Sequence, residues 1–178
     1  MNLLKFHNKI KGYTQNRQPG IEADMEPKPI AELEEYKAAG KLENKVALIT
    51  GGDSGIGRAI AILYAKEGAN VAIGYYDEHQ DAEDTVNRLQ EMGVKAKAYA
   101  HDLKDEKQSQ KLIKDVINDF GSLNILVNNG GVQFPRDHFE DITPQQVKET
   151  FMTNIFGMMF LSQAAVPYLS EGEDRKSV

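Results

Sequence analysis

The chain has 178 residues, of which 40% are hydrophobic; this length allows one globular domain with a core but not two large ones. A formal net charge of −6 gives no electrostatic reason to expect nucleic acid or an anionic membrane as a partner. The sequence holds no cysteine, which excludes disulfides and thiolate metal sites within it. Neither the N-terminal residues nor the apolar run at 155–161 has the pattern of a signal peptide or a membrane span. We therefore expect a soluble protein of the cytoplasm.

Residues 1–42 differ from the rest, because they are polar, contain Pro19, Pro27 and Pro29, and show little periodicity. We expect an extended arm here, with a short helix over residues 31–40 that ends at Gly40. The sequence leaves open whether the arm is a solvated tail or packs on the domain or on a partner subunit.

From residue 43 to 170, short apolar runs alternate with amphipathic stretches, and residues 171–178 form a polar tail. Strands are expected over 45–50, 70–76, 95–102 and 123–129, and helices over 58–68, 77–93, 106–121 and 143–169. This alternation is typical of right-handed βαβ units. The expected fold is an α/β doubly wound parallel sheet, a Rossmann fold, with strand order 3-2-1-4.

A glycine-rich turn follows the first expected strand and opens the next helix, where a phosphate-binding turn belongs. It reads Thr50, Gly51, Gly52, Asp53, Ser54, Gly55, Ile56 and Gly57. Gly51 suits a tight turn, Gly55 an approach of the backbone to a pyrophosphate, and Gly57 close packing of helix on strand. The helix N-terminus would offer free N–H groups to the phosphates. The alternative is a turn with a structural role only.

The spacing of Gly51, Gly55 and Gly57 resembles the TGxxxGxG pattern of the short-chain dehydrogenase/reductase family. It is not a P-loop, because no Lys-Ser or Lys-Thr follows Gly57. Residues 18–29 of the arm also resemble the N-terminal extension of a bacterial subgroup of general stress protein-like oxidoreductases.

Three further segments resemble the same family in order and spacing. These are Asp102-Leu103 after the third strand, Asn128-Asn129-Gly130 after the fourth, and Asn154 in the long helix. The resemblance implies that Asp102 binds the adenine amino group, that the Asn-Asn-Gly segment lines the cofactor cleft, and that Asn154 belongs to the catalytic proton relay. From the residues alone, Asp102 could instead be a helix N-cap, Asn128 and Asn129 could cap the strand, and Asn154 could be a solvated or interface residue.

The resemblance also implies a hydride transfer between alcohol and carbonyl, assisted by a Ser, a Tyr and a Lys four residues after the Tyr. The sequence contains no Tyr-x-x-x-Lys and no fifth expected strand. We therefore expect a truncated form that is inactive alone and whose complete counterpart acts on a small alcohol or carbonyl as a homo-oligomer. The competing hypotheses are a non-catalytic dinucleotide-binding module, an inactive gene fragment, and a methyltransferase that binds S-adenosylmethionine.

The cofactor stays open as NAD or NADP. NAD-selective members of the family place Asp at the end of the second strand, and NADP-selective members place Arg or Lys nearby. Here Tyr75 is at that position, Asp77 comes slightly late, and Arg58 lies just past the glycine turn. The four histidines, His7, His79, His101 and His138, share no ligand spacing, and we expect them at the surface.

Overall fold

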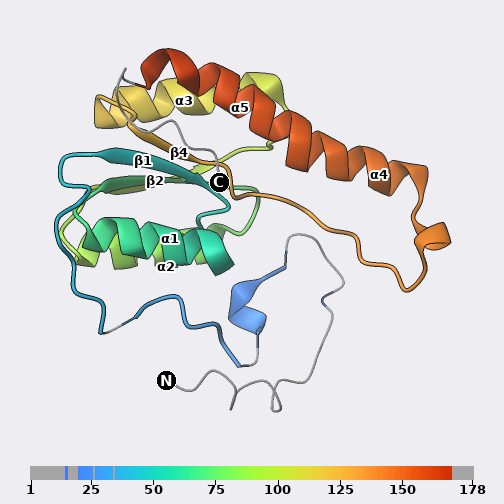
Figure 1. The fold of residues 1–178 in the computed structure, drawn as a ribbon, viewed down its shortest axis with the longest axis horizontal. Helices are drawn as coiled ribbons and strands as arrows, with labels where there is room; N and C mark the ends of the chain where they lie inside the picture. The colour runs from blue at the N-terminus through green and yellow to red at the C-terminus, as the bar shows by residue number, and fades with distance from the viewer. Residues whose placement is uncertain (1–14, 16–19, 26, 34, 170–178) are drawn as a thin grey trace.

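The computed structural model describes residue 15 and residues 20–25, 27–33 and 35–169. Four parallel strands form one sheet in the order β3-β2-β1-β4, as the sequence predicts. Figure 1 shows α1 and α2 on one face of the sheet and α3 and α5 on the other. The strands are β1 (Val46–Thr50), β2 (Asn70–Tyr75), β3 (Ala96–Ala100) and β4 (Ile125–Val127), and the helices between them are α1 (Gly55–Lys66), α2 (His79–Glu91) and α3 (Glu106–Phe120).

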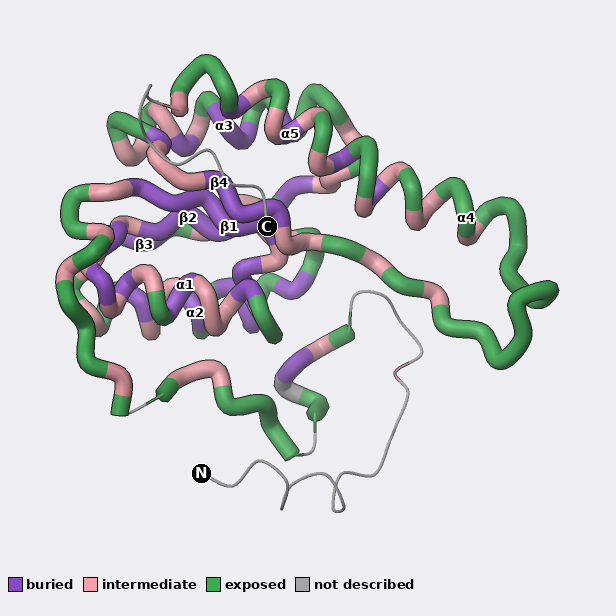
Figure 2. Tube along the Cα trace, in the orientation of Figure 1, coloured by how far each residue is buried: buried purple, intermediate pink, exposed green. Residues whose placement is uncertain are grey.

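Side chains of the central strand alternate between two apolar layers, as the period of a strand requires. Ile49 of β1 packs with residues of α1 and α2, such as Ile62 and Leu89. Leu48 faces the other way and packs with Ile113 of α3 and Leu161 of α5. Figure 2 shows the resulting continuous burial of the central strands. A sheet covered on both faces explains why β1, β2 and β4 have largely apolar sequences, whereas the edge strand β3, AKAYA, is only partly buried.

The last helical segment begins as predicted, because Thr143 is its N-cap and forms a capping box with Gln146, and Pro144 is its first residue. It is not one regular α-helix. It consists of α4 (Pro144–Phe151), a π-helical segment (Met152–Gly157) and α5 (Met158–Ala165), followed by a 3-10 turn (Val166–Tyr168). Within the described residues, no helix is long and apolar enough to cross a membrane.

The helix predicted over residues 31–40 is wrong, because the described residues of this segment are not helical. Its side chains bind the domain surface instead. Glu67 accepts hydrogen bonds from the Tyr36 hydroxyl and from the backbone N–H groups of Ala39 and Lys41. The carboxylate of Glu32 pairs with Lys66 and with Arg88. These tertiary contacts override the helix propensity of a short segment, and this part of the arm packs on the domain.

Candidate dinucleotide-binding cleft

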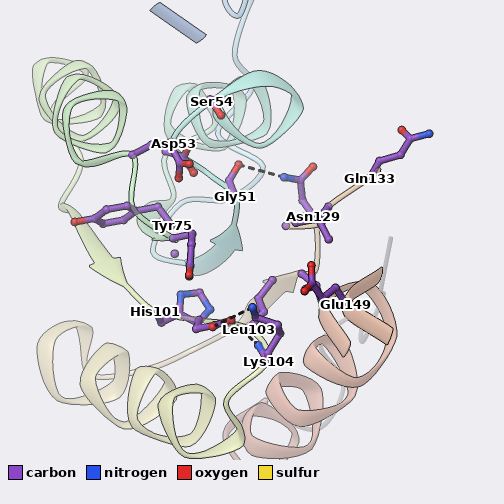
Figure 3. A pocket seen from close by; sticks show the side chains of 18 of the residues that line it. Gly51, Asp53, Ser54, Tyr75, His101, Leu103, Lys104, Asn129, Gln133 and Glu149 are labelled. Carbon is purple, nitrogen blue, oxygen red and sulfur yellow. Dashed lines mark hydrogen bonds and ion pairs between the residues drawn. The ribbon is translucent and has the colours of Figure 1, made fainter. Parts of the chain in front are cut away.

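A cleft of about 710 Å³ opens where the carboxyl ends of the four strands meet (Figure 3). In this sheet β1 is the topological switch point, since the chain runs from β1 to β2 on one side and returns to β4 on the other. Ligands of open α/β sheets bind in the crevice at such a point. Eight of the sequence-predicted site residues line the cleft: Gly51, Asp53, Ser54, Tyr75, Asp102, Leu103, Asn129 and Gly130.

The glycine turn has the conformation that its spacing predicts. Gly51 has a φ of +60°, and Gly55 has a φ of +53° with nothing within 4 Å of the position where a Cβ would be. A Cβ on Gly57 would lie 1.9 Å from the Gly51 carbonyl oxygen. The missing side chain at Gly57 therefore allows α1 to pack closely against the turn, and the open space at Gly55 allows a ligand to approach the backbone.

Two backbone N–H groups at the start of α1 remain available for an acceptor. The Gly55 N–H donates to Glu22 Oε2, and the Arg58 N–H donates to the Ser54 carbonyl. Within the described part of the chain, the N–H groups of Ile56 and Gly57 have no acceptor. Such free donors, at the positive end of the helix dipole, form an anion-binding position.

Asn129 lines the cleft and ties the first turn to the end of β4. Its side-chain amide donates to the carbonyl oxygen of Thr50 at 2.9 Å. It also donates to the carbonyl oxygen of Gly51 at 3.2 Å, the contact drawn in Figure 3. Asn128 lies behind the cleft instead, where its amide donates to Ser162 Oγ of α5 at 3.0 Å. Asn129 therefore shapes the cleft, and Asn128 holds α5 against the sheet.

Asp102 is not a helix cap. The N-cap of α3 is Asp105, whose carboxylate accepts from the N–H groups of Lys107 and Gln108. Asp102 lines the cleft, and its carboxylate lies 3.6 Å from the Lys104 ammonium and accepts from the Lys104 N–H. This position leaves the Asp102 carboxylate available to a ligand at the end of β3.

The expectation of a surface position for His101 is wrong, since only 6% of this residue is exposed. The side chain lies at the cleft, and neither ring nitrogen has a hydrogen-bond partner among the described residues (Figure 3). Burial lowers the pKa of His101, more than the nearby Tyr99 carbonyl and Asp102 raise it. A Cβ on Gly74 would lie 2.6 Å from the imidazole ring. A glycine inside a buried strand was the one sequence signal for this close approach.

Two buried carboxyl groups lie on the wall formed by the ends of β1 and β2. Asp53 is 4% and Glu78 is 7% exposed. Burial raises the pKa of Asp53, and the charges of Asp81 and Glu22 raise it further. Burial, together with contact with Asp77 and the charge of Asp53, raises the pKa of Glu78 to about 7. This side of the cleft is acidic.

Asn154 lies in the π-helical segment and does not line the cleft itself. Its side chain bonds twice to the backbone of Val132, accepting from the N–H and donating to the carbonyl, both at 2.8 Å. Val132 lines the cleft. Asn154 is thus neither free nor solvated, and it fixes the loop after β4.

Comparisons with known proteins agree with this geometry. Residues 45–176 match the family described as short chain dehydrogenase. The chain belongs to this family. It is 46% identical over 170 residues to General stress protein 39 of Bacillus subtilis, which covers 96% of the chain and 59% of that protein. This confirms the predicted family and sets aside the methyltransferase hypothesis.

Solved structures show the same relationship. A short chain dehydrogenase from Burkholderia cenocepacia in complex with NADP has a TM-score of 0.71 and 37% identity, and the match covers 75% of this chain and 54% of that one. An NAD⁺-bound xylitol dehydrogenase has a TM-score of 0.69 and 27% identity, over 72% and 49% of the two chains. The chain spans little more than half the length of the curated relatives it matches. Its neighbours include both NADP and NAD⁺ complexes, so the choice of cofactor stays open.

Proposed function

We propose that this chain binds NAD or NADP in the cleft, as the dinucleotide-binding part of an oxidoreductase that interconverts an alcohol and a carbonyl. The observation that carries the proposal is the pair of free N–H groups, on Ile56 and Gly57, beside the open position at Gly55. They lie at a helix N-terminus next to the switch point of the sheet, the arrangement that binds pyrophosphate in this class of fold.

The other predicted residues fit the remaining parts of a dinucleotide. Asp102 and Leu103 would hold the adenine, and Asp53, Ser54 and Tyr75 would lie at the adenosine ribose. Thr50, Asn129 and Gly130 would hold the backbone around the nicotinamide half. The bound nicotinamide supplies the hydride acceptor or donor. Asn154 would act as a positioning residue, through the loop at Val132 that it holds.

The names of two relatives support a small polyol or aldehyde as the substrate of the whole protein. One is the glucose and ribitol dehydrogenase of Daucus carota, at 40% identity, and the other is the NADPH-dependent aldehyde reductase 1 of Arabidopsis thaliana, at 38%. Exposed apolar side chains along the last helical segment support a homo-oligomer of the whole protein: Phe151, Ile155, Phe156 and Met159.

A non-catalytic dinucleotide-binding module is the second candidate. Binding of a dinucleotide by this chain is common to both candidates, whereas turnover of an aldehyde or polyol by the whole protein would support the first alone.

Calorimetric titration of the chain with NAD and NADP tests the proposal, with Gly55→Asp as the decisive variant. Gly93→Asp is a matched control, because Gly93 also has a positive φ, +87°, and nothing within 4 Å of its Cβ position, but it follows the C-terminus of α2 and is not part of the glycine turn. Both variants add the same strain and charge. We expect saturable binding that only Gly55→Asp abolishes. No binding by the unmodified chain, or equal loss in both variants, would contradict the proposal.

A further inference from the structure

The arm reaches the glycine turn through one buried carboxylate. Glu22 lies in a 3-10 turn (Glu22–Asp24) and is 9% exposed. Its Oε2 accepts the Gly55 N–H at 2.5 Å, and its Oε1 lies 3.0 Å from Nη1 of Arg58. Its own N–H donates to Asp81 at 3.2 Å. Ser54, the N-cap of α1, makes no side-chain cap, so Glu22 caps this helix from the arm.

Gln15 brings a second part of the arm to the same place. It lines the cleft, and its side-chain amide makes two hydrogen bonds with the backbone of Ile21, at 2.7 and 2.8 Å. The segment around Glu22 is therefore held between α1 and the mouth of the cleft. The arm is part of the surroundings of the proposed dinucleotide site.

Arg58 is a cationic residue next to the glycine turn, and its charge is paired with the carboxylate of Glu22 in the arm. Its N–H bonds to the carbonyl of Ser54, which lines the cleft, so Arg58 lies one helical turn from the wall where the adenosine ribose is proposed. An arginine near the ribose position at the end of β2 accommodates the 2′-phosphate of NADP in this class of fold, and an unpaired Arg58 would offer the same charge from α1. Here its guanidinium is paired with Glu22.

The charge of Glu22 also affects the pKa of a residue that lines the cleft. Burial is the main reason that the pKa values of the cleft residues Asp53 and Glu78 are raised; the charges of Asp81 and Glu22 add to the shift of Asp53, and the charge of Asp53 adds to that of Glu78. An anionic group placed beside Asp53 would meet these carboxylates in a partly desolvated environment, where repulsion is stronger than in water.

We propose that Glu22 is a specificity-determining residue for the dinucleotide, which acts through Arg58 and Asp53 to disfavour a 2′-phosphate. This inference rests on the proposed function. NAD and NADP differ only in that phosphate, so the ratio of their dissociation constants separates this effect from any effect of Glu22 on the pyrophosphate, which both dinucleotides share. The arm of this chain is then a selectivity element of the site.

Two substitutions with opposite expected effects test the inference. Glu22→Gln removes the charge, frees Arg58 and keeps an oxygen that can accept the Gly55 N–H. We expect it to lower the ratio Kd(NADP)/Kd(NAD) by about tenfold, the equivalent of ~1.4 kcal/mol. Arg58→Gln leaves the carboxylate unpaired, so we expect the ratio to rise. The double variant should return close to the ratio of the unmodified chain, because both charges of the pair are gone.

Glu32→Gln is the matched control, since Glu32 is an arm carboxylate that pairs with Lys66 and Arg88 and not with Gly55 or Arg58. It should leave the ratio unchanged. The ratio, measured by calorimetry on one preparation, does not depend on the fraction of folded protein. If Glu22→Gln does not fold, Arg58→Gln decides alone. An unchanged ratio in Glu22→Gln or Arg58→Gln, with both dinucleotides bound, overturns the inference and leaves the proposed function standing. No binding of either by the unmodified chain overturns both.

Discussion

The hydroxyl oxygen of Thr50 accepts two backbone hydrogen bonds, from the N–H of Asn129 at 3.0 Å and from that of Gly130 at 2.9 Å. Thr50 ends β1, and Asn129 follows β4, 79 residues later in the chain. With the return bonds from the Asn129 amide to the carbonyls of Thr50 and Gly51, this contact joins the two strand ends that frame the cleft.

Thr50→Val should therefore destabilise the domain although it conserves shape. Thr50 is 1% exposed, and valine would leave two N–H groups without their acceptor. We expect the free energy of unfolding to fall by about 1–3 kcal/mol in urea titrations. Thr50→Ser keeps the acceptor and serves as the control. A serine variant as destabilised as the valine variant would argue against the hydrogen bonds as the cause.

Replacing His101 with an apolar residue should increase the stability of the domain and weaken the binding of the dinucleotide. A buried ring without a hydrogen-bond partner costs folding free energy, and a dinucleotide in the cleft can supply that partner. We expect His101→Leu to raise the free energy of unfolding by about 1 kcal/mol and to weaken NAD binding by about tenfold.

The exposed His138 gives the control for this pair of measurements. His138→Leu should change neither stability nor binding appreciably. If His101→Leu lost stability and bound NAD as before, the histidine would be a packing residue of the sheet and not a ligand of the dinucleotide.

The parts of the fold that the sequence predicts are those that local patterns encode. Buried parallel strands need apolar runs, and the turn needs glycines where φ is positive or where a Cβ would meet backbone, as at Gly57. The parts that it does not predict depend on contacts between distant residues. The arm does not form its expected helix because its residues form hydrogen bonds with Glu67 instead, and His101 is buried because Gly74 leaves room for it. The contact of Asn154 with Val132 likewise joins residues 22 positions apart in the chain.

Asn154 holds the loop after β4, and its replacement should loosen that loop selectively. Asn154→Leu removes both hydrogen bonds to Val132. We expect the Val132 amide to exchange with solvent about tenfold faster, equivalent to a local loss of ~1.4 kcal/mol, with little change in the exchange of β1. Hydrogen exchange followed by mass spectrometry checks this. Equal acceleration in β1 would show a global loss of stability in place of a local one.

Glu78 should make the domain less stable as the pH rises through neutrality. Its pKa is about 7 in the folded protein against an ordinary value of 4.5, so between these values the folded state retains a proton that the unfolded state has released. The contribution of Glu78 to the free energy of unfolding is then fully present below about pH 4.5 and is lost as the pH rises through 7. Because this carboxyl is coupled to its neighbours, we expect a loss of only about 1–2 kcal/mol between pH 5 and pH 8.

Urea titrations of Glu78→Gln over this pH range test the assignment. The variant should be as stable as the unmodified protein near pH 5 and more stable near pH 8, with a small slope left from Asp53, whose pKa is also raised. Glu83→Gln, at an exposed carboxylate of α2, the helix that Glu78 precedes, should keep the full slope. If Glu78→Gln kept it too, the carboxyl of Glu78 would be ionised throughout, and the acidic wall of the cleft would be negatively charged already at pH 5.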